Sequence, residues 1–247
     1  MNHFMALRQM QVYQKVLNTH KENMMRFISL DHSPFAARVK TQILHKQLPI
    51  EIIAPAHGLR TPEFLAAFPL GKIPLLELNN GDYLPESTAI MEYLEDIYPQ
   101  TSCRPEDPID KAKMRVSMAY GDTHLMPAIM PYFRSLLMPE YEFDKTEQFE
   151  LLSQTLGKFE RWLVINNCND RGFYKANIDL GDMALFPIMW FVKTIIPMFH
   201  TQNVFADVPA IQQWQIWIDE NAAVLSVTQS MDTAFHAFLK SRQVTKK

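Results

Sequence analysis

Residues 26–44 read RFISLDHSPFAARVKTQIL and decide how the fold begins. The first five residues alternate in the manner of a short strand, and a polar turn follows them. Ser33 is then placed to cap a helix with its hydroxyl, while Pro34 suits the first helical position. The apolar residues that follow recur at helical spacing and are expected on one side of the helix: Phe35, Val39, Ile43 and Leu44. The stretch therefore predicts a strand, a tight turn and an amphipathic helix.

The sequence after this helix continues to alternate between short strands and helices. Residues 50–53 form a second apolar run, and a strand–helix–strand unit pairs its strands in parallel because the crossover is right-handed. The elements expected before residue 100 are a short helix from Thr61, a strand over 73–78, a strand from Tyr83 after the Asn79–Asp82 turn, and a helix over 87–98. The predicted order is β-α-β-α-β-β-α.

Strand patterns end near residue 99. A polar, proline-bearing linker is expected over 99–108, and only helical segments follow it: 108–138, 144–167, 180–194, 208–221 and 223–240. Pro127 and Pro131 are expected to bend the first of these helices. The expected fold class is α+β and then all-α. Its parts are an N-terminal extension over 1–24, a first domain over 25–100 and an all-helical C-terminal domain over 108–242.

Composition argues against several classes of function. The 24 Lys and Arg residues against 27 Asp and Glu residues leave a net charge of -3, without a dense basic cluster, so no nucleic acid is expected as a partner. Cys103 and Cys168 lack the spacing of metal ligands or of a disulfide framework, which predicts no metal and a reducing, cytoplasmic setting. The apolar stretch 183–199 is broken by Lys193 and two prolines, so it predicts a buried helix and no membrane span. Residues 1–24 lack the apolar core of a secretory signal.

Three short motifs carry a functional resemblance. They are Ser33-Pro34-Phe35-Ala36-Ala37-Arg38-Val39, Gly71-Lys72-Ile73-Pro74 and Glu86-Ser87-Thr88-Ala89-Ile90. Together they resemble the glutathione S-transferase superfamily in its serine-loop, bacterial, omega or zeta-like cytosolic form, over about residues 25–239. The resemblance implies a thioredoxin-like glutathione-binding domain followed by an all-helical domain, and a homodimer that acts in detoxification.

The resemblance gives Ser33 the catalytic role. The N-terminus of a helix carries partial positive charge and favours an anion, and a hydroxyl there can donate a hydrogen bond to a thiolate. Lowering a thiol pKa from ~8.5 by about two units takes roughly 2.7 kcal/mol, much of which one charge-assisted hydrogen bond can supply. The alternative is that Ser33 only caps its helix.

The other two motifs imply the site for glutathione, which is the expected co-substrate. Ile73 precedes a proline that is cis in the family, and its backbone pairs with the cysteinyl backbone of glutathione as an added strand does. Glu86 accepts from the γ-glutamyl ammonium, and Ser87 holds the adjacent carboxylate at a helix N-terminus. Lys72 reaches a glutathione carboxylate, or is only a solvated lysine. The glutathione-binding residues expected are Phe35, Lys72, Ile73, Pro74, Glu86 and Ser87.

A serine in the place of a cysteine favours conjugation over thiol–disulfide exchange, because serine forms no mixed disulfide. Isomerisation or dehalogenation by the same thiolate stays open. A small hydrophobic electrophile is expected between the domains, with Tyr120 and His124 as polar contacts, and each residue has core packing as its alternative. The expected apolar lining of this electrophile pocket is Met126, Met130 and Phe133. A disulfide reductase is disfavoured by Ser33. The main rival is a non-catalytic member of the fold, such as a stringent starvation protein A-like partner of RNA polymerase.

Two further signals concern folding. Asp179 and Asp182 have the spacing of a capping box, with Ile178 and Met183 placed as a hydrophobic staple. Residues 209–214 resemble the late-helix packing motif of the same family.

Overall fold

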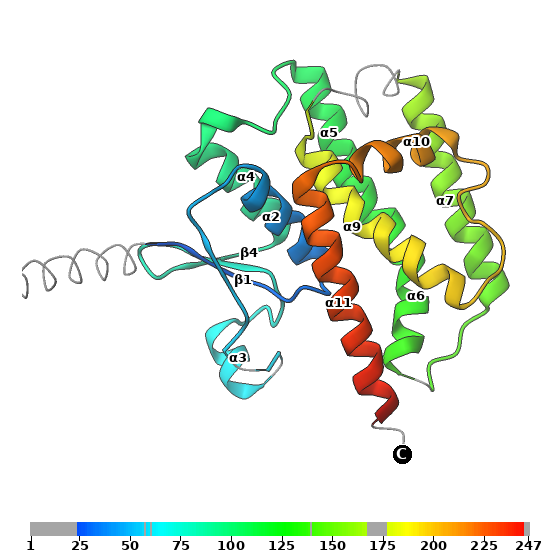
Figure 1. Ribbon diagram of the computed structural model, residues 1–247, viewed down its shortest axis with the longest axis horizontal. Coiled ribbons are helices and arrows are strands. Elements are labelled where there is room, and N and C mark those ends of the chain that lie inside the picture. The colour runs from blue at the N-terminus through cyan, green and yellow to red at the C-terminus, as the bar shows by residue number, and fades with distance from the viewer. Residues whose placement is uncertain (1–23, 57, 60, 139, 167–176, 245–247) are drawn as a thin grey trace, which may run out of the picture.

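The computed structural model describes residues 24–56, 58–59, 61–138, 140–166 and 177–244. Of the extension predicted over 1–24, only Met24 is among the described residues. Cys168 also lies outside them. Figure 1 shows the sheet-bearing part, in blue and cyan, beside a larger helical part that contains the C-terminal helix α11.

A four-stranded sheet forms the first part, in the order β2-β1-β3-β4. Its strands are β1 (Arg26–Ile28), β2 (Glu51–Ile53), β3 (Leu75–Glu77) and β4 (Tyr83–Pro85). β1 pairs in parallel with β2 and antiparallel with β3, which pairs antiparallel with β4. The helices of this part are α2 (Pro34–His45), α3 (Pro62–Ala67) and α4 (Ser87–Ile97). The predicted order β-α-β-α-β-β-α is confirmed.

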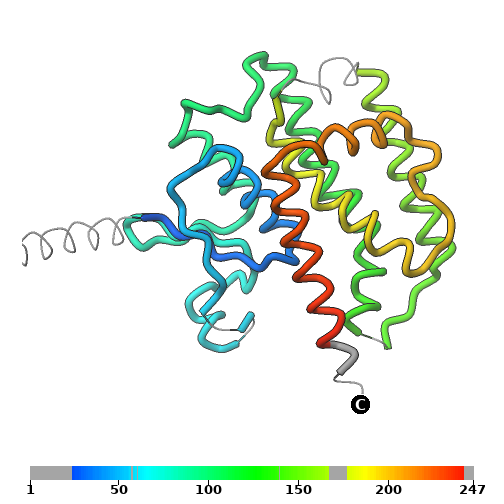
Figure 2. The backbone as a smooth tube through the Cα atoms, in the orientation of Figure 1, coloured from blue at the N-terminus to red at the C-terminus, as the bar shows by residue number. Residues whose placement is uncertain are grey.

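Helix α2 begins as predicted, with Ser33 as its cap and Pro34 as its first residue. One expected member of its buried face is wrong, because Leu44 is 37% exposed. Helix α2 packs against α4 and also against α9 and α11 of the helical part, so most of its circumference is buried before its last turn. Even Arg38 is buried there. The tube in Figure 2 shows α2 passing between the sheet and α11.

The second part is helical, as predicted. Its helices are α5 (Pro108–Tyr120), α6 (Met126–Leu137), α7 (Lys145–Ile165), α9 (Leu180–Ile195), α10 (Pro209–Ile218) and α11 (Ala222–Val244). The predicted helix over 108–138 is interrupted by a π-helical turn, Gly121–Leu125, in which the Met126 N–H donates to the Gly121 carbonyl five residues back. Pro127, which has no N–H to donate, is the second residue of α6, just after this turn.

Helix α9 forms the centre of the helical part. Residues 180–198 have the length and composition of a membrane-spanning helix, but 83% of this window is buried inside the protein. The prediction of a buried helix is confirmed. The capping box at its start is also confirmed: the Asp182 N–H donates to Asp179 Oδ1 (3.1 Å) and the Asp179 N–H to Asp182 Oδ2 (2.9 Å). The Trp214 indole of α10 donates to Asp182 Oδ1 (2.9 Å), so the same carboxylate joins α9 to α10.

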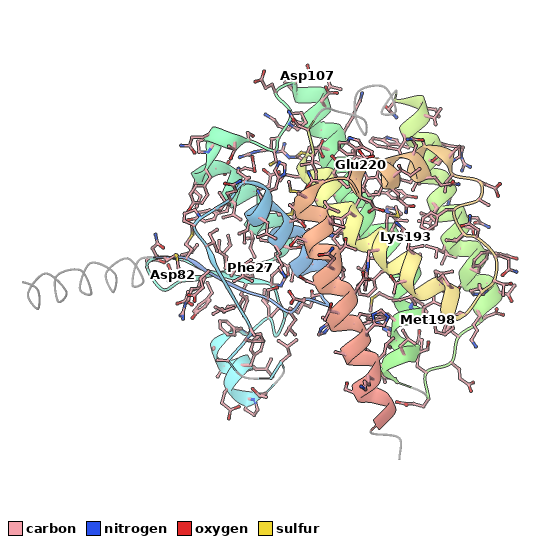
Figure 3. The ribbon with its side chains drawn as sticks, viewed as in Figure 1. Phe27, Asp82, Asp107, Lys193, Met198 and Glu220 are labelled. Atoms are coloured by element: carbon pink, nitrogen blue, oxygen red, sulfur yellow. The ribbon has the colours of Figure 1, made fainter. Side chains whose placement is uncertain are left out.

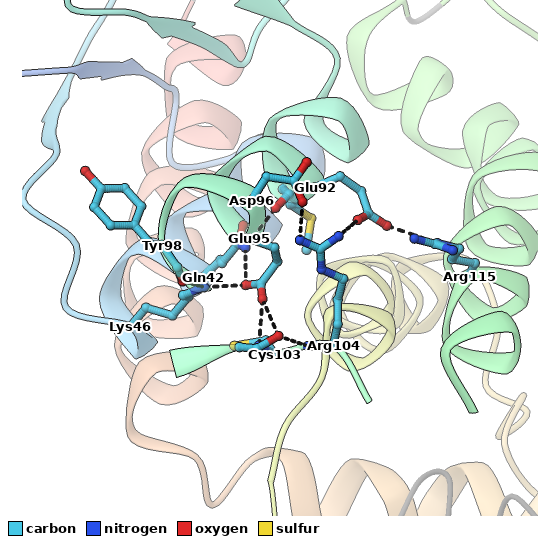
Figure 4. Close-up of polar contacts among 11 residues, drawn as sticks. Gln42, Lys46, Glu92, Glu95, Asp96, Tyr98, Cys103, Arg104 and Arg115 are labelled. Carbon is cyan, nitrogen blue, oxygen red and sulfur yellow. Dashed lines mark hydrogen bonds and ion pairs between the residues drawn. The ribbon is translucent and has the colours of Figure 1, made fainter. Parts of the chain in front are cut away.

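A buried carboxylate fastens the linker to the first part (Figure 4). Glu95 of α4 accepts from Gln42 Nε2 of α2 (2.8 Å) and from Nζ of Lys46, the residue that follows α2 (2.6 Å). Its other oxygen accepts from the Cys103 N–H (2.8 Å) and the Ser102 hydroxyl (3.0 Å) of the linker. One side chain thus fixes α2, α4 and the start of the linker relative to one another.

Candidate active site

A single cleft brings together residues from three separate segments of the first part. It is lined by Phe35, Leu70, Lys72, Ile73, Pro74, Pro85, Glu86 and Ser87. The set includes all six residues that the sequence predicted for glutathione binding, from α2, from the loop before β3 and from the start of α4. Leu70 and Pro85 were missed, because neither has a polar group that would single it out.

The loop before β3 has a constrained backbone. The Ile73–Pro74 peptide bond is cis, as expected. Gly71 has a φ of 63°, a conformation in which a β-carbon is strained, and a β-carbon there would lie 2.8 Å from Leu65 Cδ2. Pro74 is buried beneath the cleft, while Lys72 projects as an exposed cation. The loop therefore presents backbone and one positive charge to the cleft.

Glu86 is the second backbone exception at the cleft. Its φ of 68° is unusual for a residue that is not glycine, and its side chain makes no capping hydrogen bond to α4. Backbone strain of this kind costs about 1–3 kcal/mol and persists where the surroundings impose it, often at functional sites. The exposed carboxylate of Glu86 stands directly before the buried Ser87, the first residue of α4. An acceptor and helix N-terminal donors thus lie side by side, and the sequence held no signal for the strained backbone.

Ser33 lies at the N-terminus of α2, two residues before Phe35. Its Oγ accepts from the Ala36 N–H (3.3 Å), and its own N–H donates to the Leu30 carbonyl (2.9 Å). These contacts fix the hydroxyl at the helix end and leave its proton available for donation. Ser33 is half-buried and lies outside the set that lines the cleft.

The C-terminal helix reaches the loop that carries Ser33. The His32 ring stacks on Phe238 of α11, with centroids 5.5 Å apart and planes 17° apart. Phe238 also lies against Phe133 of α6, with centroids 6.4 Å apart. Burial lowers the pKa of His32, although the charge of Asp31 opposes this shift. Phe133 was expected in an apolar lining between the parts, whereas Phe238 was missed, since more than 200 residues separate it from His32.

Tyr120 and His124, the expected polar contacts of an electrophile, stack on each other beside α7. The Tyr120 hydroxyl donates to the Thr155 carbonyl of α7 (2.8 Å), and its ring stacks between His124 (4.5 Å) and Phe159 (4.8 Å). Burial raises the pKa of Tyr120. These contacts join α5 to α7, so the structure does not bring the pair to the cleft around Pro74. The packing alternative describes Tyr120 better.

A residue midway between Tyr120 and His124 in the chain makes the contact to the first part. Asp122 accepts two hydrogen bonds from Arg38 of α2, from Nη1 (3.0 Å) and Nη2 (2.6 Å). The Arg38 side chain is fully buried, and its guanidinium lies 5.1 Å from the centre of the Phe35 ring. Two residues along a helix is a turn of about 200°, which explains why Asp122 and Tyr120 face opposite sides. This ion pair positions α2, and sequence reasoning missed it.

Comparison with known proteins gives a consistent family. The family model described as "Glutathione S-transferase, N-terminal domain" matches residues 27–102. The chain is 30% identical over 206 residues to glutathione S-transferase omega-1 of Mus musculus. This match covers 83% of this chain and 80% of the mouse protein. It is 38% identical over 71 residues to maleylacetoacetate isomerase of Pseudomonas aeruginosa, a match that spans 29% of this chain and only 34% of the isomerase.

Among solved structures, a glutathione transferase family member from Pseudomonas fluorescens with bound glutathione has a TM-score of 0.66 at 20% identity. The match covers 82% of this chain and 98% of that one. At this identity the likeness shows a shared fold.

Proposed function

This chain belongs to the glutathione S-transferase family, and from that premise we propose that it binds glutathione and transfers its thiolate to a small hydrophobic electrophile. The observation that carries the proposal is the convergence of Phe35, Ile73, Pro74, Glu86 and Ser87 on one cleft. In this cleft, segments that are far apart in sequence present backbone groups, a carboxylate acceptor and a helix N-terminus. A zwitterionic peptide such as glutathione requires these three groups.

Each end of glutathione has a complementary group in this arrangement. The Glu86 carboxylate accepts from the γ-glutamyl ammonium, while Ser87 and the first amides of α4 hold the neighbouring carboxylate. The backbone of Ile73 pairs with the cysteinyl residue in the manner of an added strand. Lys72, at the open side of the cleft, attracts the remaining carboxylate. Phe35 supplies an apolar wall that Arg38 supports from behind.

Ser33 is the catalytic residue of the proposal and acts as a hydrogen-bond donor. Its hydroxyl donates to the sulfur anion at the N-terminus of α2, which stabilises the thiolate over the thiol. The thiol proton passes to solvent. The sulfur then forms a bond to the electrophilic carbon, and the leaving group departs with its electron pair. Ser33 forms no covalent intermediate in these reaction steps.

Glutathione-dependent isomerisation is the second candidate. The match to maleylacetoacetate isomerase over 71 residues favours it, and the same thiolate would add to the substrate and leave again. Cys103 argues against a disulfide reductase that uses this residue, because burial, together with the charge of Glu95, raises the pKa of its thiol to about 12.

The wider setting follows the family. We infer a cytoplasmic homodimer with a role in detoxification, in which residues 25–100 bind glutathione and residues 108–242 bind the electrophile. Sedimentation equilibrium of the full chain tests the dimer.

Retention on immobilised glutathione tests the binding proposal. The wild-type chain is expected to bind and to elute with free glutathione, whereas Glu86→Ala is expected to flow through. Glu150→Ala removes an exposed glutamate of α7 and serves as the matched control that retains binding. Equal retention of both variants would remove Glu86 from the site. Flow-through of the wild type, with polymerase subunits co-purifying from extract, would instead support the non-catalytic rival.

A further inference from the structure

A small apolar cluster holds the loop before β3 against the sheet. Figure 1 shows α3 on the side of the sheet opposite α2 and α4. The cluster on this side is separate from the main core and has three buried side chains among the described residues, Ile28, Phe64 and Leu75. Phe68 and Ile73 of the loop pack against it and are partly exposed. Because so few apolar groups are buried here, each further contact has a large share in fixing the loop.

An aromatic contact joins this loop to β4. The Phe68 ring lies against the Tyr83 ring, with centroids 4.7 Å apart and planes 77° apart, and against Phe64 of α3, with centroids 4.9 Å apart. The first geometry is the edge-to-face arrangement that aromatic rings favour. The Gly71 N–H donates to the Phe68 carbonyl (2.8 Å), so this ring belongs to the turn that leads to Ile73. We call the pair of rings, Phe68 and Tyr83, the aromatic clamp.

The aromatic clamp connects two walls of the cleft around Pro74. Phe68 begins the loop that carries Ile73, whose backbone is proposed to pair with glutathione. Tyr83 and Pro85 are two residues apart on β4, so their side chains lie on the same face of the sheet. Pro85 lines the cleft and stands directly before Glu86. The two rings thus join the wall that carries Ile73 to the wall that carries Glu86.

We propose that Phe68 and Tyr83 are positioning residues for glutathione, an inference that rests on the proposed function. The aromatic clamp sets the separation between the Ile73 backbone and the Glu86 carboxylate, and so matches the cleft to the γ-glutamyl-cysteinyl part of the ligand. Loss of either ring leaves every group that binds glutathione in the chain but no longer holds the two walls in register.

The aromatic clamp lies away from the helical part, which the proposed function assigns to the electrophile. In Figure 3, Asp82, the residue before Tyr83, lies well apart from Lys193 and Glu220 of that part. Removal of the Tyr83 ring should therefore change the binding of glutathione and not the binding of the electrophile. A general role in folding would not produce this difference, because it would affect both substrates alike.

Tyr83→Ala tests the proposal with little risk to folding, because Tyr83 is 40% exposed. Isothermal titration of the full-length protein is expected to show the Kd for glutathione raised roughly three- to tenfold, the range that one aromatic pair provides. KM for glutathione should rise likewise, while kcat and KM for 1-chloro-2,4-dinitrobenzene stay nearly unchanged. Tyr83→Phe keeps the ring and should restore the wild-type Kd. Tyr141→Ala removes an aromatic contact of the helical part and should bind glutathione as the wild type does.

A double variant tests whether the two rings act as one contact. Phe68→Ala combined with Tyr83→Ala should bind glutathione no more weakly than Phe68→Ala alone, because the effects of residues in contact are not additive. An unchanged Kd in Tyr83→Ala, a Tyr83→Phe variant that does not recover, or fully additive effects would overturn the aromatic clamp and leave the proposed function in place. A wild-type chain that does not bind glutathione would contradict the proposed function itself, and the inference with it.

Discussion

The hydroxyl of Ser33 belongs to two structures at once, the cap of α2 and the proposed thiolate site. As a cap it accepts from the Ala36 N–H, and as a donor it can still give its proton to a sulfur anion. These two roles affect different measurements, because loss of the cap lowers stability while loss of the donor changes the thiol pKa. One substitution therefore tests both.

Ser33→Ala is expected to lower kcat/KM with 1-chloro-2,4-dinitrobenzene by roughly 10- to 100-fold, the equivalent of one charge-assisted hydrogen bond. The pH dependence of the rate should shift to higher pH, because the glutathione thiol is then harder to ionise. Retention on immobilised glutathione should change little. Thermal unfolding should show a loss of about 1 kcal/mol from the missing cap.

Ser226→Ala, on an exposed face of α11, controls for the loss of a hydroxyl. An unchanged rate and pH profile in Ser33→Ala would leave Ser33 as a helix cap alone.

Cys103 offers a separate test at the scale of one residue. With a pKa of about 12 and 6% exposure, its thiol should resist alkylation in the native protein. At pH 8 only on the order of one thiol in ten thousand would be ionised. Peptide mapping by mass spectrometry after iodoacetamide treatment should find Cys103 unmodified in the native chain and modified in urea. Rapid native alkylation would contradict the buried environment.

Between elements, the buried Glu95 carboxylate links α2, α4 and the linker (Figure 4). Burial by itself would raise its pKa, but hydrogen bonds from Lys46, Gln42 and the Cys103 amide outweigh burial and lower the pKa. Because the folded-state pKa lies below the unfolded one, this group stabilises the fold above the unfolded pKa of about 4.3. That stability is lost as the pH falls through the folded-state value.

Glu95→Gln is therefore expected to lower the free energy of unfolding most at neutral pH and least in acid. Urea denaturation at a series of pH values from neutral to strongly acidic gives the comparison, with wild type and variant converging at the acid end. Glu150→Gln, an exposed substitution, should parallel the wild type. A constant difference between Glu95→Gln and wild type at every pH would contradict the linkage.

The ion pair between Arg38 and Asp122 joins α2 to the π-helical turn. Asp122→Asn leaves the fully buried guanidinium without a countercharge, and breaking such a pair typically costs about 3–5 kcal/mol. The partial exposure of Asp122 places the expected loss at the lower end of this range. Chemical denaturation measures it, and Arg38→Met combined with Asp122→Leu should recover much of the stability. Full stability in Asp122→Asn alone would show that the pair is not required.

For the whole molecule, the main consequence of the fold is that its last helix completes the surroundings of its first loop. Phe238 stacks on His32, next to Ser33, and also contacts Phe133 of α6. The aromatic surface beside the proposed thiolate is thus built from the beginning, middle and end of the chain. Substitutions in α11 should therefore change the binding of the electrophile without changing the binding of glutathione.

Phe238→Ala is expected to raise KM for 1-chloro-2,4-dinitrobenzene roughly tenfold through loss of apolar contact, with KM for glutathione nearly unchanged. Steady-state kinetics with each substrate varied in turn separates the two effects. His236→Ala, an exposed substitution on the same helix, is the matched control. Equal effects on both substrates would indicate a general disturbance of α11.

Much of the fold follows from local sequence. The caps at Ser33, Thr61 and Asp179 are readable because each side chain accepts from an amide three residues away. Short apolar runs and turn residues likewise mark the strands from Arg26 to Pro85, since pairing in parallel or hairpin units limits the topologies available. Motif resemblance added the residues of the cleft around Pro74, and the structure gathers them.

Contacts across long stretches of chain could not be read in the same way. Tyr120 was expected between the parts but packs on α7, whereas Asp122 makes the contact to Arg38, because the rotation of a helix about its axis is set by the elements that pack against it. The strained backbone of Glu86 and the stack of Phe238 on His32 likewise have no local signal. Hydrogen-bonding and periodicity act over a few residues and so determine the elements from sequence alone. The faces those elements turn to one another depend on the packing of the whole core, which only the tertiary structure decides.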